Sequence, residues 1–188
     1  MSCPWRPVAL TATIHNFDIQ LANVDRNVYE TLALRVARHP SETAEYLLTR
    51  VLAYCLEFAE GITFSKGLAD PEEPAIAVRD LTGTLLAWID IGAPDAARLH
   101  KASKAAPRVA VYTHRNPAQL LRQYAGERIH RAEALELYSF DRDMLDSLAA
   151  KLDRRMTLDV SVSDQQLYLN IGGDSLSGAI ERHPLIPA

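Results

Sequence analysis

The N-terminal part of the chain alternates between hydrophobic and polar positions. This period of two is the spacing of a half-buried β-strand. The alternation shifts by one residue between Ile14 and Phe17, which is typical of a β-bulge. The pattern predicts two long strands joined near residues 23–27, and therefore an N-terminal β-hairpin. The apolar positions are Val8, Leu10, Ala12, Ile14, Phe17, Ile19, Leu21, Tyr29, Leu32, Leu34 and Val36.

A helical period replaces the alternation after Pro40. Ser41 is a suitable N-cap residue, and Glu42 and Glu45 fall in the first turn, where the helix macrodipole favours acids. Apolar residues then recur at spacings of three and four until Gly61. The pattern predicts a helix over residues 42–60.

Short apolar segments separated by turn residues follow. Strands are expected at residues 62–65, 75–80, 84–91, 109–113 and 134–140, and helices at 94–106, 117–125 and 141–152. A closing hairpin is expected at 156–163 and 167–171. The glycine, serine and proline residues after it predict a flexible tail over about residues 173–188.

The composition is that of a globular protein. Of the 188 residues, 48% are hydrophobic and 23% are charged, and a chain of this length can bury a large core. We therefore expect one domain over residues 1–188 with an α/β fold and a mixed sheet. Cys3 and Cys55 lie far apart, which favours a reducing compartment over a disulfide framework. No signal peptide or membrane span is predicted, so we expect a cytoplasmic protein, with a monomer as the default.

The charge is unevenly distributed along the chain. The net charge is −4, which alone argues against a protein that coats nucleic acid. Residues 98–131, however, carry eight basic residues and one acid, a net charge of +7, which leaves −11 for the remainder. This basic segment is compatible with a local anion site and equally with solvated helix faces.

Two acids in the second predicted hairpin are candidates for a metal site. A two-residue turn at Leu81 and Thr82 would place Glu73 directly opposite Asp90, with Cβ atoms about 5 Å apart. Two carboxylates this close repel each other unless they share a cation or a proton, and Mg²⁺ suits such a pair. A turn moved by one residue keeps the acids on the same face, offset by two, whereas a three-residue loop places them on opposite faces.

Each acid also has a structural explanation. Glu73 precedes Pro74 in an acidic stretch and could be a solvated loop residue. Asp90 interrupts an apolar strand, so it needs either a function or a buried ion pair. Glu42 is favourable in a first helical turn without any function.

Three basic residues follow Asp90 along one helical stripe. Arg98, Lys101 and Lys104 are three residues apart, and the helix that carries them begins close to the end of the Asp90 strand. Together with the helix N-terminus they could hold a phosphate. The alternative is an amphipathic helix with a solvated basic face.

Several enzyme classes are excluded by their missing motifs. The chain has no HExxH or HxxxH spacing, no GxSxG elbow and no GxxxxGK[ST] or GxGxxG phosphate loop. Metallopeptidase, serine hydrolase, P-loop and Rossmann functions are therefore not expected.

Six short segments, in order along the chain, resemble the bacterial YaeQ family. They are ARHPSET (37–43), FSKGL (64–68), EEPAI (72–76), LTG (81–83), WIDIGAPD (88–95) and RLHKAS (98–103). The resemblance extends over nearly the whole chain.

The resemblance implies a fold similar to that of the PD-(D/E)XK nucleases. These proteins have a restriction-endonuclease-like αβββαβ core, which would cover about residues 41–114, with an N-terminal and a C-terminal β-hairpin added. In that superfamily, acids on two core strands bind the metal, a lysine two residues after the second acid activates water, and an acid on the first helix assists. Glu73 and Asp90 match the two metal acids, and Glu42 matches the helix acid.

Two positions depart from the pattern of that superfamily. Pro74 follows the first acid instead of preceding it, and Gly92 stands where the lysine is expected. Losing that lysine removes a group that orients water and offsets charge. Lys101 could replace it from the following helix.

Two hypotheses from different classes result. The first is a nuclease or phosphodiesterase dependent on Mg²⁺ or Mn²⁺, in which Glu73 and Asp90 hold the metal and Glu42 and Lys101 assist catalysis. Arg98 and Lys104 would then bind phosphate. The second, favoured by Gly92, is a non-catalytic protein on the same scaffold that binds nucleic acid or a protein partner.

Overall fold

Ten strands form one mixed sheet in the computed structural model, which describes residues 11–65 and 72–185. The order of the strands is β2-β1-β8-β9-β10-β7-β6-β5-β4-β3. The pairs β1·β8, β5·β6 and β6·β7 are parallel, and the other pairs are antiparallel. The strands are β1 (Thr13–Asn23), β2 (Val28–Arg38), β3 (Ile62–Phe64), β4 (Ile76–Arg79), β5 (Leu85–Ile91), β6 (Arg108–Thr113), β7 (Glu136–Phe140), β8 (Arg155–Ser163), β9 (Gln166–Ile171) and β10 (Asp174–Pro184).

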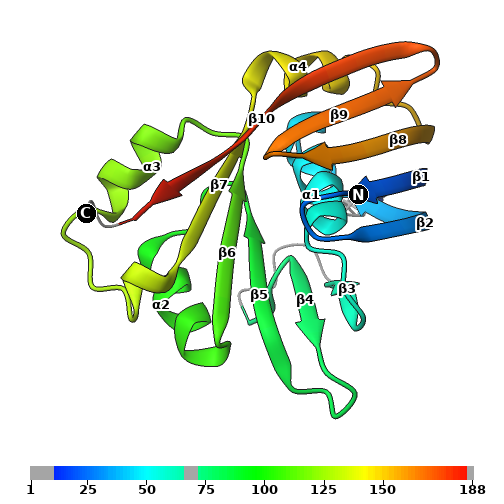
Figure 1. Ribbon diagram of the computed structural model, residues 1–188. Helices are drawn as coiled ribbons and strands as arrows, with labels where there is room; N and C mark the ends of the chain where they lie inside the picture. The colour runs from blue at the N-terminus through cyan, green and yellow to red at the C-terminus, as the bar shows by residue number, and fades with distance from the viewer. Residues whose placement is uncertain (1–10, 66–71, 186–188) are drawn as a thin grey trace, which may run out of the picture.

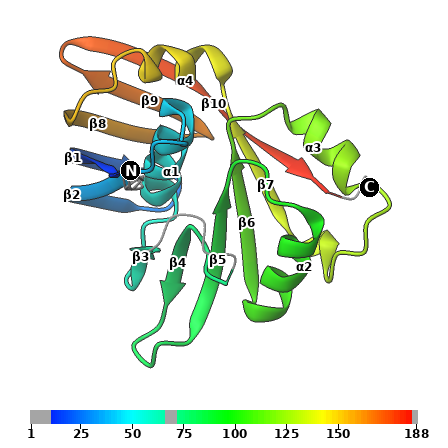
Figure 2. The same ribbon diagram turned by 180° about the vertical axis from the view of Figure 1, so that it is seen from behind.

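Helices cover both faces of the part of the sheet formed by β5, β6 and β7. α1 lies in the concave side of the curved sheet, between β1, β8 and β9 and the strands β5 and β6, whereas α2 and α3 lie on the other side of β5–β7 (Figures 1 and 2). The helices are α1 (Ala44–Leu56), α2 (Ala96–Ala105), α3 (Pro117–Tyr124) and α4 (Arg142–Ala149). The mixed α+β class predicted from the sequence is confirmed, and α1, β3, β4, β5, α2 and β6 follow one another in the predicted order.

The first helix is shorter than predicted. Thr43, rather than Ser41, is the N-cap, because its side-chain oxygen accepts a hydrogen bond from the main-chain N–H of Tyr46. The helix ends at Leu56, where Glu57 is the C-cap residue. The shorter helix keeps the predicted apolar face, so α1 packs through the residues that the helical period indicated.

The predicted flexible tail is wrong for residues 174–184, which form β10. The first part of this strand pairs with β9 and the second part with β7, so β10 joins the two halves of the sheet. Its composition misled the prediction, because the strand contains Gly178 and serine residues. Gly178 is needed for packing, since a Cβ atom there would lie 2.5 Å from Cβ of Asp141. Residues 186–188 lie outside the described part of the chain.

The register of the β4–β5 hairpin differs from the prediction by two residues. Ile76 lies opposite Ile89, with a register shift between Val78 and Arg79. The turn is longer than expected because the carboxylate of Asp80 accepts hydrogen bonds from the main-chain N–H groups at positions 82 and 84. The longer turn and the shift together preserve the predicted face of Asp90 but remove its pairing with Glu73.

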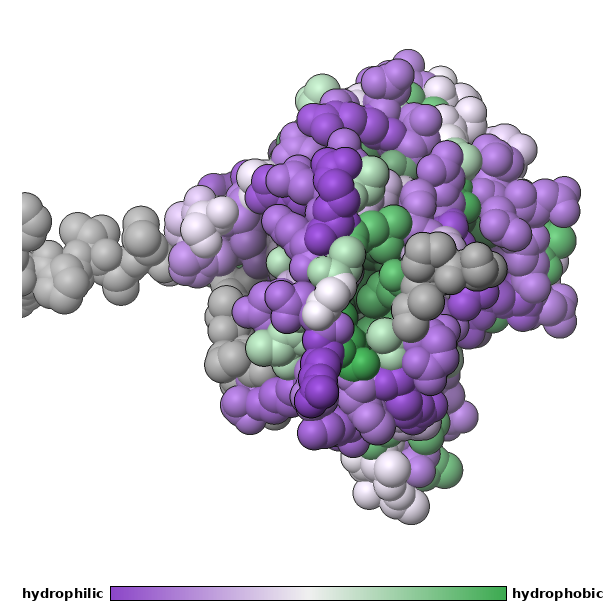
Figure 3. Space-filling model, turned by 90° about the vertical axis from the view of Figure 1, so that its left-hand side faces the viewer, coloured by the Kyte–Doolittle hydropathy of each residue, from purple (hydrophilic) through white to green (hydrophobic). Residues whose placement is uncertain are grey.

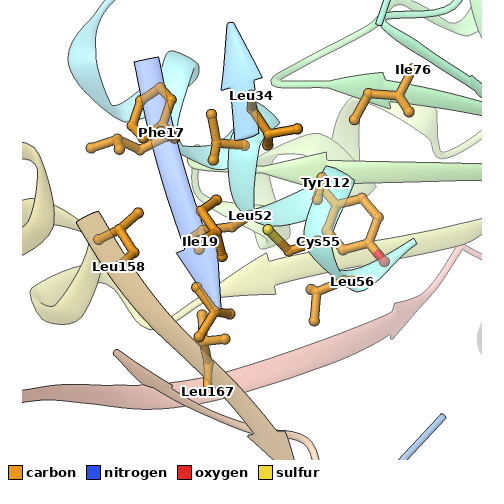
Figure 4. Close-up of a cluster of buried hydrophobic side chains, with 14 of the residues drawn as sticks. Phe17, Ile19, Leu34, Leu52, Cys55, Leu56, Ile76, Tyr112, Leu158 and Leu167 are labelled. Atoms are coloured by element: carbon orange, nitrogen blue, oxygen red, sulfur yellow. The ribbon is translucent and has the colours of Figure 1, made fainter. Parts of the chain in front are cut away.

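Two apolar clusters fill the space on the two faces of the sheet. The larger cluster surrounds α1 and α4, and Figure 4 shows part of it, with Leu52 and Cys55 of α1 among side chains from the surrounding strands. The smaller cluster lies under α2 and α3 and includes Trp88, Leu99 and Leu120. Polar residues dominate the outside of the molecule on the α3 side, around a central apolar band (Figure 3). In the described part of the chain, no helix is long and apolar enough to cross a membrane.

Candidate functional site

Asp90 is buried and forms a two-point ion pair with Arg98. Side chains alternate along β5, so Asp90 faces α2, as Trp88 does, while Ile89 and Ile91 face α1. Arg98, in the first turn of α2, donates from Nε to Oδ2 and from Nη2 to Oδ1, each over 2.8 Å. Its guanidinium carbon also lies 5.4 Å from the centre of the Trp88 ring. The Asp90 carboxylate is 3% exposed, so the arginine supplies the charge partner that its burial requires.

Glu73 approaches this pair through its main chain. Its carbonyl oxygen accepts a hydrogen bond of 2.7 Å from Nη2 of Arg98. The residue lies in the exposed bend before β4, and its carboxylate forms no hydrogen bond with a described residue. Asp90 and Glu73 are therefore brought together, but only one of the two contributes a carboxylate.

The other predicted site residues are held elsewhere. The Glu42 carboxylate accepts a hydrogen bond of 3.2 Å from the main-chain N–H of His39 and lies 3.5 Å from Nη2 of Arg50. Glu42 just precedes α1, which covers the opposite face of β5 from α2, so it does not join the Asp90 carboxylate. Lys101 forms an ion pair with Glu72, and Lys104 is exposed in the last turn of α2.

This arrangement of side chains does not fit a divalent metal ion. Among residues 11–65 and 72–185, no group of three or more His, Cys, Asp or Glu side chains is placed to hold a metal. Both oxygens of the Asp90 carboxylate are bonded to the guanidinium of Arg98. Mg²⁺ would require those oxygens as ligands.

Gly92, at the position expected to carry the catalytic lysine, has a backbone conformation and neighbours that disfavour a side chain. Gly92 has a φ of +88°, which side-chain-bearing residues rarely adopt. A Cβ atom there would lie 3.3 Å from the ring of Tyr46 and 3.6 Å from Cε1 of His114. A lysine at residue 92 would need both a strained backbone and a displaced tyrosine.

A cavity of about 350 Å³ lies beside Gly92, where β6 ends and α1 begins. His114 lines it together with Arg115 and Tyr46. The rings of Tyr46 and His114 form an edge-to-face pair, with centres 5.9 Å apart. On the rim, Nδ1 of His39 lies 2.6 Å from Oγ of Ser41. Burial, followed by the charge of Arg115, lowers the pKa of His114 below its usual value of 6.5.

The lowered pKa of His114 predicts a loss of stability in mild acid. The unfolded chain binds a proton more readily than the folded chain, so stability is complete above pH 6.5 and falls as the pH drops toward the folded pKa. Urea unfolding of the wild type and of His114→Gln across this range should show a shallower pH dependence for the variant. The exposed His130→Gln variant is the matched control, and an equal change in both variants would contradict the assignment.

A second polar cluster was not predicted from the sequence. Glu57, 7% exposed in its side chain, accepts hydrogen bonds of 2.6 and 2.9 Å from Arg108 and one of 2.6 Å from the hydroxyl of Tyr112. Arg108 also donates to Glu136 over 2.6 Å. Glu57 interrupts an apolar stretch of the sequence. This position could have predicted the cluster, because a carboxylate on a buried helix face requires a partner.

Comparison with known proteins identifies relatives over most of the chain. The family model described as "YaeQ protein" matches residues 8–179. "Uncharacterized protein YaeQ" of Escherichia coli (strain K12) is 33% identical over 164 residues, which are 87% of this chain and 91% of the relative. The protein of the same name from Salmonella typhi is 32% identical over 170 residues, or 90% and 94% of the two chains.

Two crystal structures of YaeQ proteins are similar in fold. The protein from Xanthomonas axonopodis pv. citri superposes with a TM-score of 0.81 at 30% identity and covers 92% of this chain and 98% of its own. The protein from Pseudomonas syringae also gives a TM-score of 0.81, at 27% identity, over 91% and 95% of the two chains.

Proposed function

The chain belongs to the YaeQ family, and we propose that it is a non-catalytic protein with a restriction-endonuclease-like core that binds nucleic acid without a metal ion. The order α1, β3, β4, β5, α2, β6 supports the proposed relation to that core. The proposal combines two features of the α2 side of the sheet, which are the state of the Asp90 carboxylate and the distribution of basic side chains.

The Asp90–Arg98 ion pair is the main observation in favour of a protein that does not hydrolyse nucleic acid. A metal-dependent nuclease uses its acids to hold the ion that stabilises charge on the scissile phosphate. Here the guanidinium of Arg98 takes both oxygens of Asp90 and the main-chain oxygen of Glu73. Gly92 supports the same conclusion, since its positive φ and the nearby Tyr46 ring disfavour a water-activating lysine at this position.

Exposed basic side chains near α2 and α3 favour a phosphate polymer as the ligand. Of the eight basic residues in the segment 98–131, Arg98, Lys101 and Arg108 are paired with acids. The other five are exposed and form no ion pair within the described residues. They are Lys104, Arg115, Arg122, Arg128 and Arg131. Lysine and arginine side chains without an acidic partner can neutralise phosphates with release of counterions.

Fluorescence anisotropy with labelled single-stranded and double-stranded DNA and RNA tests this function. We expect binding that is equally strong in EDTA and in Mg²⁺ or Mn²⁺, that weakens between about 50 and about 200 mM salt, and that is not accompanied by cleavage. The triple variant Lys104→Gln, Arg122→Gln, Arg128→Gln should bind more weakly. The slope of log K against log salt should become shallower by about one unit for each phosphate that the variant no longer neutralises.

A triple variant on the other half of the sheet is the matched control. Arg35, Arg154 and Arg155 are exposed on or beside β2 and β8, and replacing them with glutamine removes the same charge. This control should bind as the wild type does. Equal weakening in both triple variants, or no binding to any of the polymers, would overturn the proposal.

A metal-dependent nuclease is the second candidate, and one geometric observation favours it. Nη2 of Arg98 lies 2.8 Å from Oδ1 of Asp90 and 2.7 Å from the carbonyl oxygen of Glu73, so the two oxygens converge on one cation position. Oxygens of these kinds are ligands that Mg²⁺ and Mn²⁺ accept. Metal-dependent cleavage that disappears in Asp90→Asn would establish this candidate in place of the first.

A further inference from the structure

A cavity of about 620 Å³ lies where the two halves of the sheet meet, away from Asp90. It is bounded by the β1–β2 turn, the C-terminal end of α1, the strands β6, β7 and β10, and the β8–β9 turn. β10 crosses from one half to the other at this junction (Figures 1 and 2). The volume falls within the range of about 300 to about 1,000 Å³ that is usual for small-molecule sites.

The acids that line this cavity already have their partners. Glu57 is bonded through both oxygens to Arg108 and through one of them to Tyr112. Asp25 accepts hydrogen bonds of 2.7 and 3.0 Å from the main-chain N–H groups of Asp164 and Gln165, which join the two turns. The carboxylates are therefore satisfied, and none of them requires a cationic ligand.

Two arginines of the same cavity keep unused donors. Arg26, from the β1–β2 turn, uses Nη1 to donate to the carbonyl oxygen of Leu56 and forms no ion pair with a described acid. The guanidinium of Arg182, on β10, forms no hydrogen bond or ion pair with any described residue. The two side chains come from different halves of the sheet and line one cavity, so their donors can be shared by a single anion.

The rest of the cavity wall consists of an aromatic ring and apolar side chains. Tyr138 is half-buried and lines the cavity, with its ring stacked at 5.0 Å on the buried ring of Tyr112. Figure 4 shows Tyr112 beside Cys55 and Leu56 of α1. Leu56, Val162 and Ile180 add apolar surface. A flat apolar group is the natural complement of such a wall.

We propose that this cavity binds a small organic anion, a phosphate or carboxylate attached to a flat ring. The anionic group lies between Arg26 and Arg182, and the ring packs against Tyr138 and its apolar neighbours. The site is separate from the α2 and α3 surface, so it does not depend on nucleic-acid binding.

Isothermal titration calorimetry with 1-naphthyl phosphate tests this site. We expect a dissociation constant below about 1 mM, with inorganic phosphate and 1-naphthol each binding at least about tenfold more weakly, because each lacks one half of the ligand. Arg182→Gln and Arg26→Gln should each weaken binding of 1-naphthyl phosphate by about tenfold. Arg182 is exposed and its guanidinium is unbonded among the described residues, so Arg182→Gln is expected to unfold at the wild-type temperature, which a thermal scan checks.

Arg154→Gln removes another exposed charge, outside the cavity, and should leave the affinity unchanged. Affinity for 1-naphthyl phosphate that is the same in Arg182→Gln as in the wild type would overturn the site. So would equal affinity for 1-naphthol, or no detectable binding of 1-naphthyl phosphate to the wild type. Measuring 1-naphthoate in the same way shows whether a carboxylate can replace the phosphate.

Discussion

Replacing Arg108 with methionine is expected to lower the free energy of unfolding by about 3 kcal/mol at neutral pH. The substitution leaves the Glu57 carboxylate charged and 7% exposed, with the hydroxyl of Tyr112 as its one remaining hydrogen-bond partner among the described residues. It also removes the ion that links Glu57 to Glu136 across the sheet. The arginine is itself 38% exposed, so we expect a loss at the lower end of the range for buried pairs.

The loss should depend on pH in a definite direction. Burial alone would raise the pKa of Glu57, but the hydrogen bonds and charge of Arg108 and the hydroxyl of Tyr112 hold it below the usual value of 4.5. The pair therefore contributes stability above pH 4.5, and this contribution is lost as the pH falls through the folded pKa. The difference between the wild type and Arg108→Met should accordingly be greatest at neutral pH and should shrink in acid.

Urea unfolding at several pH values measures both effects, with Arg122→Met on α3 as the control. Arg122 is exposed and unpaired among the described residues, so its replacement should cost no more than about 0.5 kcal/mol. Equal losses for the two variants, or a loss for Arg108→Met that does not change with pH, would show that Glu57 does not depend on this partner.

The sequence predicted most helices and strands because their apolar periods are long and regular. The exception is β10, whose pairing with β9 and β7 depends on main-chain hydrogen bonds and on the absence of a side chain at Gly178. Hydrophobic periodicity carries no information about either property. The β4–β5 register was also beyond the sequence, because it depends on a side-chain hydrogen bond of Asp80 in the turn.

The candidate site was predicted in part. A charged residue in an apolar strand marked Asp90 as needing a partner, and the structure confirms that need. The partner could have been a metal or a base, and the sequence did not distinguish them. Whether a metal or a base pairs with Asp90 depends on the face of β5 that the carboxylate occupies and on its distance from the first turn of α2. Both are determined by the packing of the helix on the sheet.

Replacing Arg98 with methionine is expected to cost about 3 kcal/mol, because it leaves the 3%-exposed Asp90 carboxylate without its charge partner. In a double-mutant cycle with Asp90→Asn, the coupling energy should be about 2 kcal/mol, within the range for residues in direct contact. Lys104→Met, which removes an exposed charge from the same helix, is the control and should couple to Asp90→Asn by less than about 0.5 kcal/mol. A coupling energy near zero for Arg98 would mean that the ion pair does not form.

Replacing Arg98 with alanine tests whether its guanidinium lies where a divalent metal ion could otherwise bind. Arg98→Ala frees the Asp90 carboxylate and the Glu73 carbonyl oxygen, so we expect Mn²⁺ to raise the unfolding midpoint of this variant and to leave that of the wild type unchanged. Arg98→Ala combined with Asp90→Asn should lose the response. If Mn²⁺ instead stabilises the wild type and Arg98→Ala equally, the ion binds without displacing the arginine. The Asp90–Arg98 ion pair would then not prevent hydrolysis, and a metal-dependent nuclease would become the better account of this site.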